Sequence, residues 1–145
     1  MKKTYVLLAV LLLGIASVAL GSEGWLTDFE QAQKEAAARN LPILVDFSGS
    51  DGCGWCIKLD KEVFSKSEFK EYAEENVVLF LADFPQRKEL PATVKAQNEK
   101  LSNQYGVRGF PTVLLLDADG EVLGRTGYKA GGPAEYVKHL KSLLK

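Results

Sequence analysis

Both cysteines of the chain, Cys53 and Cys56, lie in the short stretch SGSDGCGWCIK, residues 48–58. Two thiols at this spacing can bind a metal, close a structural disulfide, or alternate between dithiol and disulfide states. A structural zinc site needs four ligands, and besides the two cysteines the chain has one histidine, His139. We expect His139 to lie on the solvent side of the last helix without a chemical role. A disulfide that closes so short a loop removes little entropy from the unfolded chain. Redox exchange without a metal is therefore the favoured interpretation.

The position of the pair along the chain favours the same chemistry. Residues 43–47, ILVDF, are typical of a buried strand, residues 48–52 are turn material, and a helical apolar pattern begins at Cys53. The start of a helix stabilises a thiolate, and thiols in such places have pKa values of roughly 3.5–7.5. We therefore expect Cys53 to be the exposed nucleophile and Cys56, one turn later, to be its shielded partner.

The remaining sequence predicts one α/β domain. The chain has 145 residues and a net charge of -1, which gives no electrostatic reason to bind nucleic acid. Capping boxes predict helix starts at Thr27 and Ser65. Continuous apolar strands between helices predict parallel strands covered on both faces, with an antiparallel hairpin at one edge. The expected fold is therefore a three-layer sandwich around a central mixed sheet. The expected helices are 28–40, 53–63, 66–73, 91–105 and 133–144, and the expected strands are 43–47, 77–83, 112–116 and 121–126.

The first 21 residues have the pattern of a secretory signal peptide. A basic start precedes an apolar run over residues 6–20, and small residues stand before a cut near Gly21. We expect a domain over residues 22–145 in a periplasmic or secreted setting, where disulfides form and persist. The alternative is an uncleaved membrane anchor, although the run is shorter than the roughly 18 apolar residues of a spanning helix.

Several motifs, in this order, resemble the thioredoxin superfamily, and in particular its exported single-domain members with a Cys-Gly-Trp-Cys centre. The motifs are ILVDF at 43–47, Cys-x-x-Cys at 53–56, YGVRGFPT at 105–112 and DGEV at 119–122. The resemblance covers roughly residues 26–144. It implies a thioredoxin-like fold and a cis Phe110–Pro111 bond beside a Cys53–Cys56 disulfide. It further implies that the backbone at Pro111 pairs with an extended substrate strand.

The chain also departs from that family. Gly52 precedes the first cysteine, where cytosolic thioredoxins have tryptophan, and Asp46 lacks the lysine that usually accompanies it on the next strand. Burial without a cation should raise the pKa of Asp46. Asp46 is either a proton acceptor for Cys56 or a buried acid that is hydrogen-bonded to the backbone. Asp51 either opposes thiolate formation at Cys53 or caps the helix.

These observations predict a thiol–disulfide oxidoreductase that acts on protein disulfides. Trp55, Phe110 and Pro111 are expected to form an apolar substrate patch. We expect a monomer without a cofactor, re-reduced by a membrane electron donor, and a reductase rather than an oxidant. Gly54, Trp55 and Phe110 do not by themselves separate reductase, oxidant and isomerase. The alternative from another functional class of protein is a non-catalytic binding module whose disulfide stays closed.

Overall fold

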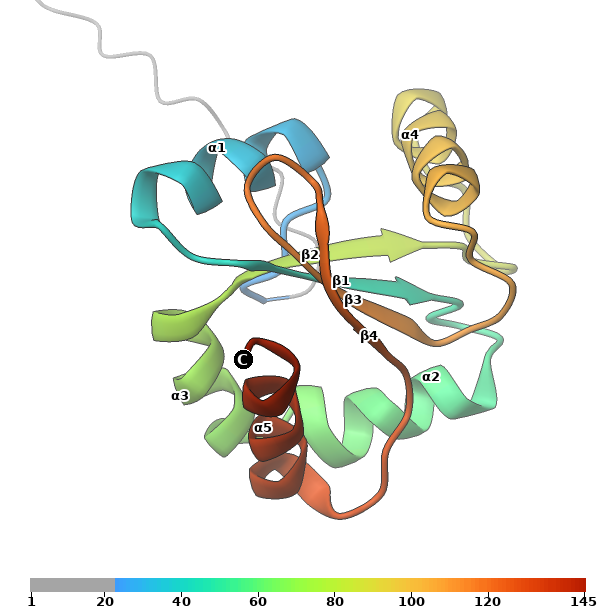
Figure 1. The fold of residues 1–145 in the computed structure, drawn as a ribbon. Helices are drawn as coiled ribbons and strands as arrows, with labels where there is room; N and C mark the ends of the chain where they lie inside the picture. Colours follow the sequence, from blue (N-terminus) through green and yellow to red (C-terminus); the bar gives the residue numbers. More distant parts are fainter. Residues whose placement is uncertain (1–22) are drawn as a thin grey trace, which may run out of the picture.

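The computed structural model describes residues 23–145, so the predicted signal peptide and its cleavage site lie outside the described residues. Among the residues described, no helix is long and apolar enough to cross a membrane. Helices and strands alternate along the chain (Figure 1). The elements are α1 (Phe29–Arg39), β1 (Ile43–Ser48), α2 (Gly54–Leu59), the π-helical turn η1 (Asp60–Phe64), α3 (Ser67–Asn76), β2 (Val78–Asp83), α4 (Ala92–Gln104), β3 (Thr112–Leu116), β4 (Val122–Thr126) and α5 (Gly132–Leu143).

The four strands form one mixed sheet in the order β2-β1-β3-β4. Strand β1 runs parallel to β2 and antiparallel to β3, and β3 runs antiparallel to β4. The predicted mixed sheet with its antiparallel β3–β4 hairpin is confirmed. The antiparallel β1–β3 pair was not anticipated, because continuous apolar strands between helices favoured parallel pairing there. The segment from β2 through α4 leads the chain back to the edge where β1 ends, so that Thr112 pairs with Phe47. This return places the loop before β3 beside the segment that follows β1.

Helices cover both faces of the sheet, which confirms the predicted layers (Figure 1). Alternate residues of β1 face opposite layers, as strand geometry requires. Leu44 packs in a core with α2, η1, α3 and α5, whereas Val45 and Phe47 pack in a second core with α1 and α4. Every residue of β1 is buried, including the polar residues Asp46 and Ser48.

The N-cap of α1 is Asp28, not Thr27 as predicted. The Asp28 carboxylate accepts a hydrogen bond from the backbone N–H of Gln31 at 3.1 Å. Aspartate is as good a cap as threonine, so the capping-box pattern left the choice between these neighbours open.

The predicted cap at Ser65 was also wrong. Helix α3 begins at Ser67, Lys66 occupies the N-cap position, and no side chain caps the helix. The Ser65 hydroxyl donates to the Lys61 carbonyl at 3.3 Å instead. Ser65 thus belongs to the end of η1, a tight connection that the capping pattern did not reveal.

Replacing Asp28 by alanine should lower the free energy of unfolding by about 1 kcal/mol, because an N–H at the start of α1 loses its acceptor. Urea unfolding of the Asp28→Ala variant measures this loss. Asp119→Ala, at an exposed turn position, serves as the control and should change stability by less than about 0.5 kcal/mol. Equal stability of the two variants would show that the cap contributes nothing.

Candidate active site

Cys53 and Cys56 form a disulfide at the N-terminus of α2, with their Cα atoms 5.2 Å apart. Cys53 is the N-cap residue, and its Sγ accepts a hydrogen bond from the backbone N–H of Cys56 at 3.2 Å. Cys53 is half-buried, whereas Cys56 is 4% exposed and belongs to the core. Helix α2 thus presents one sulfur at the surface and keeps the other inside.

The loop before β3 lies directly against this disulfide. The carbonyl oxygen of Phe110 is 3.5 Å from Cys53 Sγ, and the Phe110–Pro111 peptide bond is cis. On the inner side, the backbone N–H of Gly49 points to Cys56 Sγ at 3.5 Å. Backbone polar groups therefore contact both sulfurs.

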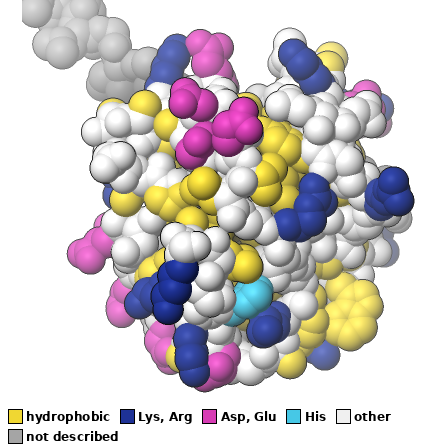
Figure 2. All heavy atoms as spheres, in the orientation of Figure 1, with side chains coloured by type: hydrophobic (Ala, Val, Ile, Leu, Met, Phe, Trp, Pro, Cys, Tyr) yellow, Lys and Arg dark blue, Asp and Glu magenta, His cyan; other side chains and the backbone are white. Residues whose placement is uncertain are grey.

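Two aromatic pairs lie near the cysteines. Trp55, predicted to be exposed, is 57% exposed, and its ring centroid is 5.0 Å from that of Tyr128. Phe110 is 38% exposed and stacks on Phe84 with centroids 5.0 Å apart. Figure 2 shows hydrophobic side chains at the surface in the region of α2. Sequence reasoning missed Tyr128 and Phe84, because only the fold brings Tyr128 to Trp55 and Phe84 to Phe110.

Asp46 lies behind the disulfide and is 7% exposed. Its Oδ1 is buried and accepts no hydrogen bond. This observation disfavours the alternative in which Asp46 is a buried acid that is hydrogen-bonded to the backbone through this oxygen. Burial, and then the nearby carboxylates of Asp60 and Asp83, raise the pKa of Asp46 to about 8. The predicted rise is confirmed, whereas the two neighbouring acids were not anticipated.

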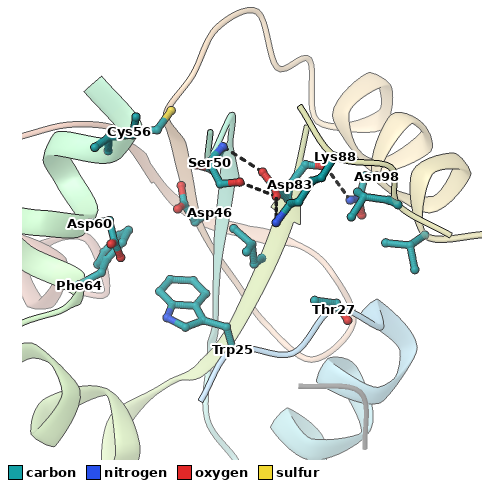
Figure 3. Close-up of a pocket in the computed structure, with 15 residues that line it drawn as sticks. Trp25, Thr27, Asp46, Ser50, Cys56, Asp60, Phe64, Asp83, Lys88 and Asn98 are labelled. Atoms are coloured by element: carbon teal, nitrogen blue, oxygen red, sulfur yellow. Dashed lines mark hydrogen bonds and ion pairs between the residues drawn. The ribbon is translucent and has the colours of Figure 1, made fainter. Parts of the chain in front are cut away.

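Asp46 and Cys56 line one cavity of about 350 Å³, which we call the back cavity (Figure 3). It lies between α2 and η1 on one side and the ends of β1 and β2 with α4 on the other. Its polar and charged lining residues include Ser50, Asp60, Asp83, Lys88 and Asn98.

Asp51 does not cap α2, so that interpretation was wrong. Its carboxylate accepts hydrogen bonds from the backbone N–H groups of Gln86 and Arg87, both at 2.7 Å. These bonds lower the pKa of Asp51. The carboxylate therefore ties the loop after β2 to the turn before Cys53, a role that local sequence did not indicate.

His139 is partly buried rather than on the solvent side of α5. Its Nε2 lies 2.8 Å from the hydroxyl oxygen of Thr126, and burial lowers its pKa. Over residues 23–145, no group of three or more histidine, cysteine or acidic side chains could hold a metal ion.

Comparison with known proteins agrees with this geometry. Residues 29–143 match the family model of the thioredoxin-like domain. The disulfide bond reductase DsbH of Chlamydia pneumoniae is 38% identical over 117 residues, which are 81% of this chain and 70% of DsbH. The thioredoxin-related protein DsbJ of the same organism is 28% identical over 71% of this chain and 30% of its own length. A solved structure of DsbH oxidoreductase superimposes with a TM-score of 0.80 at 34% identity, covering 94% of both chains.

The chain belongs to the thioredoxin-like domain family. With a Cys-x-x-Cys disulfide at the mouth of a helix, it is a thiol–disulfide oxidoreductase.

Asp46 should make stability depend on pH. The carboxyl group loses its proton near its ordinary value of 3.8 in the unfolded chain but near pH 8 in the folded protein. Between these values the folded state holds the extra proton, so the free energy of unfolding falls as pH rises. Asp46→Asn should therefore be about 2–4 kcal/mol more stable than the unsubstituted protein at pH 8, with little or no gain at pH 4.

Urea unfolding of the oxidised proteins at both pH values tests this prediction. Asp119→Asn, in an exposed turn, controls for the loss of one negative charge and should show no such difference between the two pH values. A gain for Asp46→Asn that is the same at pH 4 and pH 8 would contradict the prediction.

Proposed function

We propose that this protein reduces protein disulfides in an extracytoplasmic compartment. The observation that supports this best is the Cys53–Cys56 disulfide at the start of α2, with one sulfur at the surface and the other in the core. The similarity to a protein named disulfide bond reductase supports reduction as the direction.

In the proposed reaction the Cys53 thiolate attacks one sulfur of the substrate disulfide. A mixed disulfide forms, and the other substrate sulfur leaves as a thiolate. Cys56 then attacks Cys53 Sγ, which releases the second substrate thiolate and restores the Cys53–Cys56 disulfide. Two electrons pass from the protein dithiol to the substrate. The arrangement fits these roles because Cys53 is accessible and Cys56 is shielded from competing disulfides.

Asp46 is the proposed proton acceptor for Cys56. The Cys56 thiol must lose its proton before its sulfur can attack, and a carboxylate with a pKa near neutrality is well matched to that transfer. Asp46 has the required pKa, and it lines the same cavity as Cys56. A direct contact or one bridging water could carry the proton.

Trp55, Phe110 and Pro111 form the proposed substrate patch around Cys53. An extended substrate segment would pair with the backbone beside Pro111, in the manner of an added strand, while exposed aromatic rings hold its side chains. Support comes from the exposure of Trp55 and Phe110 and from the short distance between the Phe110 carbonyl and Cys53 Sγ.

The proposed compartment is the periplasm or another site outside the cytoplasm. The signal-peptide pattern of residues 1–21 supports export. A membrane-bound dithiol donor would then re-reduce the Cys53–Cys56 pair after each turnover. We propose that the protein works as a monomer, because a free face beside Cys53 serves both substrate and donor.

The redox potential of the Cys53–Cys56 pair should lie near -270 mV, about the value of thioredoxin. Equilibration in thiol buffers, followed by the fluorescence of nearby Trp55, measures it. A potential near about -120 mV would instead define an oxidant. A disulfide that resists reduction until the protein unfolds would support the non-catalytic binding module.

Cys56→Ser should trap a mixed disulfide with a protein substrate, and the matched Cys53→Ser variant should trap none.

Trp55→Ala should raise KM for a protein disulfide about tenfold, because the substrate loses an aromatic surface worth roughly 1.4 kcal/mol. The KM for a small disulfide should hardly change, since such a substrate does not reach beyond Cys53. Steady-state kinetics with both substrates separate the two effects. Leu123→Ala, which removes an exposed apolar side chain on β4, is the control. Equal increases in KM for both substrates would argue against the patch.

A further inference from the structure

The exposed indole of Trp55 belongs to a cluster of four side chains, which we call the tryptophan cluster: Trp55, Lys58, Glu62 and Tyr128. The Tyr128 ring lies against the indole, with centroids 5.0 Å apart and the two planes at 48°. Lys58 Nζ lies 5.1 Å from the ring centroid of Trp55 and 5.3 Å from that of Tyr128. The Lys58 ammonium group therefore lies over both rings, where the aromatic quadrupole attracts a cation.

Glu62 connects the two sides of this cluster. One carboxylate oxygen, Oε2, accepts a hydrogen bond from the Tyr128 hydroxyl at 2.6 Å. The other, Oε1, lies 3.9 Å from Lys58 Nζ. The side chains of Lys58 and Glu62 are 48% and 37% exposed, so this ion pair by itself adds little stability. Its effect is geometric, because one carboxylate ties the Tyr128 ring and the Lys58 cation together.

The loop that carries Tyr128 is fixed on two sides. The Tyr136 hydroxyl of α5 donates to the Gly127 carbonyl at 2.8 Å. On the other side, a Cβ atom on Gly127 would lie 3.0 Å from the Pro111 carbonyl oxygen, so the loop packs closely against the cis-proline segment. Tyr128 therefore contacts the Trp55 indole from a backbone that is anchored to both α5 and Pro111.

These contacts restrict a side chain that would otherwise move freely. Trp55 is 57% exposed, and exposed side chains change rotamer within picoseconds to nanoseconds. A mobile indole would lose that freedom each time a substrate bound to it, which weakens binding. An indole that Tyr128 and Lys58 already keep in one orientation avoids this loss. A small disulfide that reacts at Cys53 without covering Trp55 gains nothing from the arrangement.

We propose that Lys58, Glu62 and Tyr128 are positioning residues, which keep the Trp55 indole in the orientation that protein substrates bind. The proposal rests on the proposed reduction of protein disulfides and on the substrate patch around Cys53. The tryptophan cluster then determines specificity, because it favours protein disulfides over small ones without contacting the reacting sulfurs.

The order of the indole is measured by ¹⁵N NMR of the oxidised protein. The heteronuclear NOE of the Trp55 indole N–H should be close to that of buried Trp25 and should fall clearly in Tyr128→Ala. Smaller decreases are expected in Lys58→Met and in Tyr128→Phe. Trp55→Phe identifies the signal by removing it. An indole that is as mobile in the unsubstituted protein as in Tyr128→Ala would overturn the proposal.

Lys141→Met is the matched control for Lys58→Met. Lys141 Nζ lies 5.5 Å from the ring centroid of Tyr72, so this variant removes the same kind of contact between α5 and α3. It should change neither the indole NOE nor the kinetics. Lys58 is exposed, so Lys58→Met tests the cluster even if Tyr128→Ala does not fold.

A double-mutant cycle tests the effect on substrates. The ratio of KM for a protein disulfide to KM for a small disulfide should rise about fivefold in Tyr128→Ala. It should rise about twofold in Tyr128→Phe, which keeps the ring but loses the hydrogen bond to Glu62. Trp55→Ala should raise the ratio about tenfold, and adding Tyr128→Ala should raise it no further, because no indole is left to position. A rise of about fiftyfold in the double variant would show that Tyr128 binds substrate independently and would overturn the proposal.

The outcomes distinguish this proposal from the proposed function. If the KM ratio responds to no substitution of Tyr128 or Lys58 while Cys56→Ser still traps mixed disulfides, the positioning role fails and the reductase remains. If the dithiol exchanges with no protein disulfide, the proposed function fails, and the positioning role fails with it even where the indole is rigid.

Discussion

The complete burial of β1 is the constraint on which the site depends. This strand lies between β2 and β3, with a helical layer on each face, so its carboxyl end has one fixed position. The short turn that follows delivers Cys53 to the start of α2. The antiparallel β3 starts opposite the same end, which brings the Phe110 carbonyl to 3.5 Å from Cys53 Sγ. A shift of β1 would therefore separate the disulfide from both Asp46 and the Pro111 loop.

The same burial creates the electrostatic character of the site. Asp46 occupies a strand position whose neighbours are apolar, and removal from water is the largest cause of its raised pKa. The other acids near it add to this effect instead of relieving it. Charge compensation is found further out, where Lys88 pairs with Asp83. The protein thus keeps an acid poised to exchange a proton close to neutral pH, at some cost to its stability.

The loop between β2 and α4 links the two sides of the site. Asp51, in the turn before Cys53, holds the backbone of this loop through two short hydrogen bonds. The loop carries Lys88 to the back cavity, and Phe84 at its start stacks on Phe110 beside the cysteines. One segment therefore contributes both to the surface near the disulfide and to the wall of the cavity behind it.

The sequence by itself determined the class of fold, the cysteine pair and its position at a helix start, and the burial of Asp46, because these follow from local hydrophobic patterns and residue spacing. The cap at Asp28 was missed, since aspartate and the neighbouring threonine are both good caps. The start of α3 was missed because no side chain caps this helix. Only the tertiary structure decided the antiparallel pairing of β3, the true partners of Asp51, and the approach of Tyr128, Phe84 and Asp83 to the cysteines and Asp46. These depend on how segments more than twenty residues apart pack together, and no local pattern encodes that packing.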